Sequence, residues 1–148
     1  MNVRITRLRD DIPLPEYKTE GAVAFDLSAS ERCTLPPKQV THVPTGLIIA
    51  TPPGYALILA PRSSLMKKTG LCLGNGIGII DQDFCGPEDE IKLVMWNPTD
   101  AEVIVEKGDR LVQAMFLAVE RVTWTEGLTE AKSRGGLGST GGYTEGTI

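Results

Sequence analysis

The sequence is poor in aromatic residues, histidine and cysteine, and it has no excess of positive charge. Its 148 residues include one histidine, three cysteines and 5% aromatic residues, and the formal net charge at pH 7 is −4. General binding of nucleic acid needs a basic face, so this charge argues against nucleic acid as a partner. An acidic chain that binds phosphate groups must use individually placed arginines, backbone N–H groups or a metal ion.

Long apolar runs and cysteine pairs with metal-ligand spacing are also absent. No run of apolar residues is long enough to span a membrane, and the segment 1–15 has no apolar stretch of signal-peptide length. Cys33, Cys72 and Cys85 form no CxxC motif, and any disulfide would leave one of them unpaired. We therefore expect a soluble cytoplasmic (intracellular) protein with reduced thiols, no membrane partner and no zinc site.

Glycine and proline are abundant, with 16 and 10 residues, and they divide the chain into short apolar segments. One short helix is expected after Ser63 or Ser64, which are suited to cap it, and Gly70 is suited to end it. Segment 30–39 is expected to be a polar loop. A first strand is expected near Val3 and Ile5, and further strands at 41–50, 54–60, 91–97, 101–106, 111–119 and 122–125. Many short strands separated by turns indicate an all-β sandwich or closed barrel.

The stretch 74–90, GNGIGIIDQDFCGPEDE, carries the strongest local signal for a site. A β-branched run ends at Asp81 and a turn follows, so this carboxylate is expected at the end of a buried strand, where it can position a water molecule. An aspartate at a strand end is also a common turn former, and this stretch alone does not separate the two interpretations.

Three other segments carry groups that bind phosphate. Pro61-Arg62-Ser63-Ser64 places a guanidinium and two hydroxyls where a strand meets a helix. Gly108-Asp109-Arg110 is expected to form a turn with an Asp–Arg pair, and the strand after it carries Gln113. In GGLGSTGG (135–142), glycine N–H groups and the Ser139 and Thr140 hydroxyls can donate to phosphate, although the same composition is typical of a flexible tail.

Five segments in this order resemble the five motifs of the trimeric dUTP pyrophosphatases (dUTPases). They are AVAFDLSA (22–29), PRSSL (61–65), GNGIGIIDQDFCG (74–86), GDRLVQAMF (108–116) and RGGLGSTGG (134–142). The resemblance implies a jelly-roll or distorted β-barrel domain at 1–132, a homotrimer with active sites at subunit interfaces, and a C-terminal arm at 133–148 that closes them. It also implies Mg²⁺-dependent hydrolysis of dUTP to dUMP and pyrophosphate, which limits uracil incorporation into DNA and supplies dUMP for dTMP synthesis.

Matched motif by motif, the resemblance implies a role for each site residue. Asp81 would be the general base for a water that attacks the α-phosphorus in line. Asp26 would act through waters on Mg²⁺, whose direct ligands would be substrate phosphates. The other expected substrate contacts are Asn75, Gly78 and Ile80 at the uracil, Phe84 under the deoxyribose, Arg62, Ser63, Ser64 and Gln113 at the phosphates, and Arg134, Leu137, Gly138, Ser139 and Thr140 from the arm.

The chain departs from the family pattern in the domain and in the arm. Phe84 stands where tyrosine is common, and Ala24 replaces a usual glycine. An acidic insertion of about three residues at 87–90 precedes the next strand, and the resemblance assigns it no role. In the arm, Leu137 takes the place of a phenylalanine that stacks on the base, and either Arg134 or Lys132 can match the family's arginine, since the spacing is shorter than usual.

Two alternatives to dUTP hydrolysis remain open from the sequence. The dCTP deaminases share the fold and a helix-start motif similar to Arg62-Ser63-Ser64, but their chemistry needs a glutamate where this chain has Val94. A dUTPase-like trimer that binds nucleotide and regulates a partner protein is the other alternative. Asp81 and the arm hydroxyls argue for turnover instead.

Overall fold

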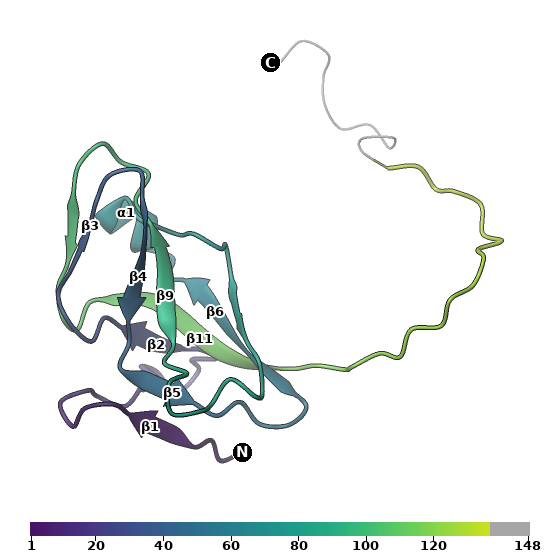
Figure 1. Cartoon of the computed structure of the whole chain (residues 1–148), viewed down its shortest axis with the longest axis horizontal. Helices are drawn as coiled ribbons and strands as arrows, with labels where there is room; N and C mark the ends of the chain where they lie inside the picture. Colours follow the sequence, from purple (N-terminus) through teal and green to yellow (C-terminus); the bar gives the residue numbers. More distant parts are fainter. Residues whose placement is uncertain (137–148) are drawn as a thin grey trace, which may run out of the picture.

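The computed structural model describes residues 1–136 of the chain and shows an all-β fold with one short helix (Figure 1). In chain order the elements are β1 (Ile5–Arg7), β2 (Phe25–Ser28), β3 (Cys33–Leu35), β4 (Val40–Pro44), β5 (Leu47–Ile49), β6 (Tyr55–Pro61), α1 (Leu65–Thr69), β7 (Cys72–Leu73), β8 (Gly78–Ile80), β9 (Lys92–Trp96), β10 (Val103–Val105) and β11 (Arg110–Ala118). A four-stranded sheet has the order β2-β11-β6-β8, and a three-stranded sheet has the order β4-β9-β7. The pairs β1-β5 and β10-β3 complete the antiparallel framework.

The core lies between the two larger sheets, as the alternation of side chains along their strands requires. In β9, Leu93 and Met95 are fully buried, whereas Lys92 and Trp96 are exposed. Leu93 and Met95 belong to one buried cluster with Leu57 of β6. Burying each such side chain contributes about 1.5–3 kcal/mol relative to leaving it exposed, so the packed core fixes the register of every strand that carries the site.

The single strand expected at 41–50 is wrong, because the chain breaks there into β4 and β5. Gly46, between them, has a φ of +71°, and a Cβ at this position would lie 2.8 Å from Cγ1 of Ile12. Only glycine meets both conditions without strain. The break sends the chain from the three-stranded sheet to the β1-β5 pair. The polar loop expected at 30–39 also contains a strand, β3, which pairs with β10.

The strand expected at 122–125 is likewise wrong, since residues 119–136 contain no helix or strand. Trp124 is 89% exposed and Val122 is also exposed. Figure 1 shows the segment after β11 leaving the body of the molecule. The alternating pattern is that of a strand, but a strand forms only against a partner, and residues 1–136 supply none to it.

The helix α1 begins and ends at the expected residues, but its expected side-chain cap is not formed. Gly70 follows it in the left-handed conformation, with φ of +74°, and its N–H donates to the carbonyl oxygen of Met66. Ser64 occupies the N-cap position, yet its hydroxyl makes no capping hydrogen bond. The hydroxyl is therefore not used by the helix. In the described range, no helix is long and apolar enough to cross a membrane.

Candidate functional site

One carboxylate joins two arginines at an end of the four-stranded sheet. Oδ1 of Asp26, on β2, lies 2.9 Å from Nε of Arg62, and its Oδ2 lies 2.9 Å from Nη1 of Arg110. The Asp26 side chain is only 15% exposed, so water screens these contacts less than it would at an open surface. In the register of β11, Gln113 lies opposite both Asp26 and Ala60. The sheet thus brings Asp26 together with residues from two of the segments expected to bind phosphate, Arg62 from one, and Arg110 and Gln113 from the other.

The turn before β11 places Arg110 beside Asp26. Asp109 accepts a hydrogen bond from the Glu106 N–H through Oδ2 at 2.9 Å, and Gly108 has a φ of +90°. Two backbone hydrogen bonds, Gly108 N–H to Ala29 O and Ala29 N–H to Asp109 O, hold the turn against the loop after β2. The expected Asp109–Arg110 pair is therefore wrong, because Asp109 closes its own turn and Arg110 pairs with Asp26.

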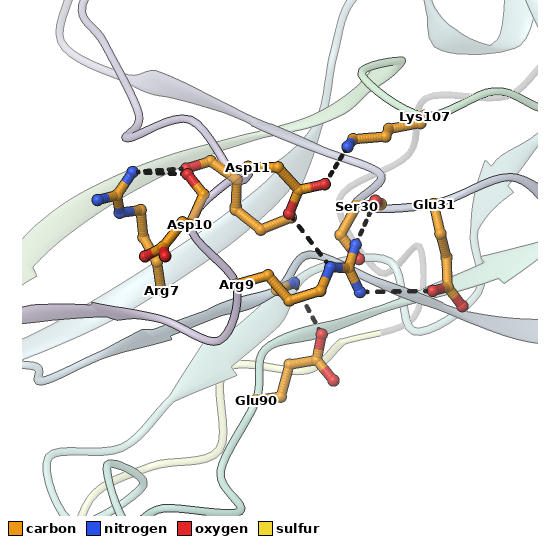
Figure 2. Close-up of polar contacts among 10 residues, drawn as sticks. Arg7, Arg9, Asp10, Asp11, Ser30, Glu31, Glu90 and Lys107 are labelled. Carbon is orange, nitrogen blue, oxygen red and sulfur yellow. Dashed lines mark hydrogen bonds and ion pairs between the residues drawn. The ribbon is translucent and has the colours of Figure 1, made fainter.

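A surface cluster of charged residues includes Lys107, which lies in the same turn (Figure 2). Lys107 contacts the carboxylate of Asp11, whose Oδ1 lies 3.3 Å from Nε of Arg9. Arg9 also donates to the carbonyl oxygen of Ser30 at 2.7 Å and lies 3.6 Å from Glu31. The hydrogen bond from Lys107 is the largest cause that holds the pKa of Asp11 below its usual value. These charges are exposed and stabilise the fold little, but they orient the loops next to Asp26.

Arg62 is fixed at both its backbone and its guanidinium. Its N–H donates to the carbonyl oxygen of Leu111, and its Nη1 donates to that of Arg110, each at 3.3 Å. Gln113 donates to the carbonyl oxygen of Pro61 at 3.2 Å. Ser63 is exposed and follows Arg62 directly. A guanidinium held in this way is pre-organised for bidentate contacts to phosphate oxygens.

The loop between β7 and β8 connects the two larger sheets, since β7 pairs with β9 and β8 pairs with β6. Asn75 is exposed near its tip, where Gly76 has a φ of +73°. Gly78 is buried, and a Cβ there would lie 3.1 Å from Cβ of Leu59. Close packing on β6 therefore favours a small residue at 78, in addition to any contact that its backbone makes with a base.

Asp81 directly follows β8, as the sequence predicts, and its side chain is exposed. The expectation that this strand is buried is wrong, because β8 is an edge strand of the four-stranded sheet and its Ile79 is 60% exposed. A turn comes next, in which the Phe84 N–H donates to the carbonyl oxygen of Asp81 at 3.4 Å. The Phe84 side chain is 39% exposed. An acid and a flat ring thus stand on one short loop at the end of a strand, where a nucleotide and a water molecule can reach both.

Within one chain, Asp81 and Arg62 lie toward opposite ends of β6. Ile80, immediately before Asp81, pairs with Leu57, and Arg62 comes five residues after Leu57. At about 3.3 Å per residue, this separation is roughly 16 Å along the strand. The structure thus gathers Asp26, Arg62 and Gln113 at one place and presents Asp81 and Phe84 at another.

Part of the expected arm lies outside the described residues, namely Leu137, Gly138, Ser139 and Thr140. Arg134 and Lys132 are both described and both exposed. The sequence did not predict the contact of Arg110 with Asp26 or the side-chain hydrogen bonds of Gln82 to Tyr55 and of Asp89 to Gly86. No periodic pattern indicates the Asp26–Arg110 contact, because its partners lie 84 residues apart and meet only through strand pairing.

Comparisons with known proteins identify the family of this chain. A family model described as dUTPase matches residues 10–141. The chain is 37% identical over 147 residues to the deoxyuridine 5′-triphosphate nucleotidohydrolase of Streptomyces avermitilis, with 97% of this chain and 82% of that protein covered. It is also 37% identical over 144 residues to the enzyme of the same name from Legionella pneumophila strain Paris, with 93% of each covered.

Solved structures confirm the jelly-roll fold class. The dUTPase from Streptococcus mutans superposes with a TM-score of 0.77 and 32% identity, over 84% of this chain and 100% of that one. A dUTPase of Staphylococcus bacteriophage 80alpha gives a TM-score of 0.84 over 95% of this chain and 98% of that one, but at 20% identity it shows the fold alone. From its motifs, its fold and its relatives, this chain belongs to the dUTPase family and is an enzyme that hydrolyses dUTP.

Proposed function

We propose that Asp81 is the general base of dUTP hydrolysis in this chain and that it directs a water molecule at the α-phosphorus, giving dUMP and pyrophosphate. The observation that carries this proposal is the exposed carboxylate fixed at the end of β8. A base must hold its water within hydrogen-bond reach of the attacked atom, which requires a rigid support. Phosphoryl transfer depends mainly on such positioning and on neutralised charge.

The Asp26–Arg62–Arg110 group is the proposed phosphate side of the site. Arg62, with Ser63, Ser64 and Gln113, would bind the phosphate oxygens through a charged fork, hydroxyls and an amide. The carboxylate of Asp26 keeps both guanidinium groups oriented before the substrate arrives. Pre-orientation reduces the entropy that these side chains would otherwise lose on binding.

The residues present fit a magnesium ion carried by the substrate. Among residues 1–136, no three His, Cys, Asp or Glu side chains are grouped as metal ligands, so a cage made by the protein alone is not available there. Oδ2 of Asp26 accepts a hydrogen bond from Arg110, Oδ1 forms an ion pair with Arg62, and each oxygen keeps capacity for a water molecule. Mg²⁺ commonly keeps waters and binds through substrate phosphates. Asp26 would hold it through water, and the ion would neutralise phosphate charge.

A homotrimer with shared sites is the proposed assembly. The separation of Asp81 from Arg62 supports it, because a second copy can bring its own Asp81 to the Arg62 of the first. The outward face of the four-stranded sheet supports it further. Met115, Ile58 and Ile79 form one row across that face, and Ile79 is 60% exposed. A row of apolar side chains on an outward sheet face is suited to contact with another copy.

The proposed nucleoside side of the site lies on the β7–β8 loop, on β8 and on the loop after β8. Asn75, with the backbone around Gly78 and Ile80, would read the uracil edge, and the ring of Phe84 would lie under the deoxyribose. Because phenylalanine has the same ring face as tyrosine, exclusion of a 2′-hydroxyl should persist without the tyrosine hydroxyl.

In the described range, Cys33, Cys72 and Cys85 are free thiols, which supports the proposed cytoplasmic location.

Incubating the pure protein with each deoxynucleoside triphosphate and Mg²⁺ tests the proposed reaction. We expect pyrophosphate without orthophosphate from dUTP, and no ammonia from dCTP. The reason is Val94, whose carbonyl oxygen accepts the Gly74 N–H at 2.7 Å. Val94 therefore lies beside the β7–β8 loop without supplying a carboxylate. Pyrophosphate, orthophosphate and ammonia are assayed in parallel. Ammonia above background from dCTP would support deamination instead.

The arm offers a second test, at Leu137. The resemblance places an aromatic ring over the uracil there, and stacking of a base on an aromatic ring is worth roughly 1–3 kcal/mol. Leucine recovers part of this by apolar contact, so Leu137→Phe should gain about 1 kcal/mol and lower KM for dUTP about fivefold. Leu137→Ala should raise KM. Steady-state kinetics measure both, and values within twofold of the wild type for both variants would mean that the arm does not cover the base.

A further inference from the structure

The loop that carries Asp81 is held by two side chains outside the proposed catalytic set. Near its start, Nε2 of Gln82 donates to the carbonyl oxygen of Tyr55 at 3.1 Å. At its end, Oδ2 of Asp89 accepts the N–H of Gly86 at 2.7 Å. Asp81 directly precedes Gln82, and Phe84 lies between Gln82 and Gly86. The positions of both residues therefore depend on these two hydrogen bonds.

The Gln82 contact continues the sheet beyond its last backbone pair. β6 and β8 are paired as far as Leu57 and Ile80, and Tyr55 is the first residue of β6. Gln82 is half-buried, and its amide reaches the sheet edge from the residue next to Asp81. The hydrogen bond therefore restrains the backbone that would otherwise be free to turn the Asp81 side chain away from its water.

The Asp89 contact closes the far end of the loop and comes from the acidic insertion. The Asp89 N–H donates to the carbonyl oxygen of Gly86 at 3.1 Å, so the two residues are joined in both directions. A hydrogen bond to a carboxylate is stronger than one to a neutral acceptor. A Cβ at Gly86 would lie 3.0 Å from the same carboxylate oxygen, so a larger residue at this position would push against Asp89.

The insertion is itself tied to the body of the molecule. Oε1 of Glu90 accepts the N–H of Gly46 at 2.7 Å, a contact drawn as a dashed line in Figure 2. Ile91 follows, is buried, and donates its N–H to the carbonyl oxygen of Leu47. Glu90, the residue after Asp89, is thus bonded to the turn between β4 and β5, which fixes the position of Asp89. Asp89 in turn fixes the position of Gly86.

We propose that Gln82 and Asp89 are positioning residues for dUTP hydrolysis, which hold loop 81–86 so that Asp81 keeps its water in line with the α-phosphorus. The inference rests on the proposed role of Asp81 as the base. A misplacement of about 1 Å can cost on the order of 10²-fold in rate. Losing one of the two hydrogen bonds should displace the loop by less than about 1 Å, so we expect kcat to fall about tenfold.

Variants at both supports test the proposal in the full-length protein. Gln82→Ala and Gln82→Glu both remove the donor to Tyr55, and each should lower kcat about tenfold while KM for dUTP stays within threefold. Asp89→Ala should act in the same direction, and Asp89→Asn, which keeps a carbonyl acceptor for the Gly86 N–H, should restore most of the rate. Glu88→Ala is the matched control, since Glu88 is an exposed acid of the same insertion. Thermal unfolding of each variant checks that the domain remains folded.

The outcomes separate this inference from the role of Asp81 when Asp81→Asn is measured beside these variants. If Asp81→Asn is inactive but Gln82→Ala and Asp89→Ala keep kcat within twofold of the wild type, Gln82 and Asp89 are not positioning residues. The role of Asp81 as the base would then still stand. An active Asp81→Asn would overturn the base. Equal losses in Asp89→Asn and Asp89→Ala, or a loss in Glu88→Ala, would show a general effect of the insertion and would also overturn the proposal.

Discussion

Asp81→Asn is expected to abolish dUTP hydrolysis while leaving the affinity for dUTP within a few-fold of the wild type. The amide has nearly the same shape as the carboxylate but cannot take a proton from the attacking water. A positioned general base typically contributes about 10²–10⁴-fold in rate. Because Asp81 is exposed and follows the last residue of β8, the substitution removes no core contact, and the variant should fold normally.

Two measurements decide this prediction. Pyrophosphate release gives kcat, and calorimetric titration of the variant with dUTP gives its affinity without turnover. Glu88→Gln provides a matched control, because it neutralises an exposed carboxylate a few residues further along the chain. The control should turn over like the wild type. Turnover of Asp81→Asn within tenfold of the wild type would remove Asp81 from the role of base.

Removing all residues after Lys132 is expected to leave a folded trimer with very low activity. The described part of the removed segment, 133–136, is exposed and belongs to no sheet, so its loss costs no core packing. The arm nevertheless carries Ser139 and Thr140, which are the proposed donors to the phosphates. Light scattering, circular dichroism and pyrophosphate release measure assembly, folding and activity in one preparation. A full-length protein that is monomeric and still turns over dUTP would contradict the trimer.

Mixed assemblies test whether the sites are shared between chains. The truncated chain keeps Asp81 but lacks the arm, and full-length Asp81→Asn keeps the arm but lacks the base. If the two parts of a site come from different copies, trimers formed by refolding a mixture should recover measurable activity. Each parent refolded alone should not recover it. Mixtures that stay inactive would place the arm and the base of a site on the same chain.

The local chemistry of the site could be predicted from the sequence because it lies within short segments. A β-branched run before Asp81 predicts a strand that ends at the acid, and β8 ends at Ile80. The turn after Gly108 and the end of the helix at Gly70 follow in the same way from residues that tolerate positive φ. Each of these predictions needs only neighbours in the chain, and the structure confirms all of them.

Contacts between distant segments could not be predicted in this way. Arg110 reaches Asp26 across 84 residues because β11 pairs with β2, and the sequence does not state that pairing. The break at Gly46 depends on the position of Ile12, another distant residue. The turn from Gly86 to Asp89 is different, because its glycine, proline and aspartate form a short local turn signal. Its relation to Asp81 is clear only once the whole loop is seen.

The segment 122–125 does not form the expected strand, and the reason is physical. Its alternation of Val122 and Trp124 with threonines is a sound strand pattern, but hydrogen bonds across a sheet require a neighbouring strand. No described strand pairs with it in one chain, and both apolar side chains are exposed. Sequence patterns therefore give the tendency of a segment, whereas pairing decides whether that tendency is realised.

The most direct test of the account is hydrolysis of dUTP in water enriched in oxygen-18, followed by mass spectrometry of both products. A water activated by Asp81 and directed at the α-phosphorus forms the new P–O bond there and breaks the bond to the pyrophosphate leaving group. The account predicts one heavy oxygen in dUMP and none in pyrophosphate. Heavy oxygen in pyrophosphate, with unlabelled dUMP, would place the attack on the β-phosphorus and contradict the proposed mechanism.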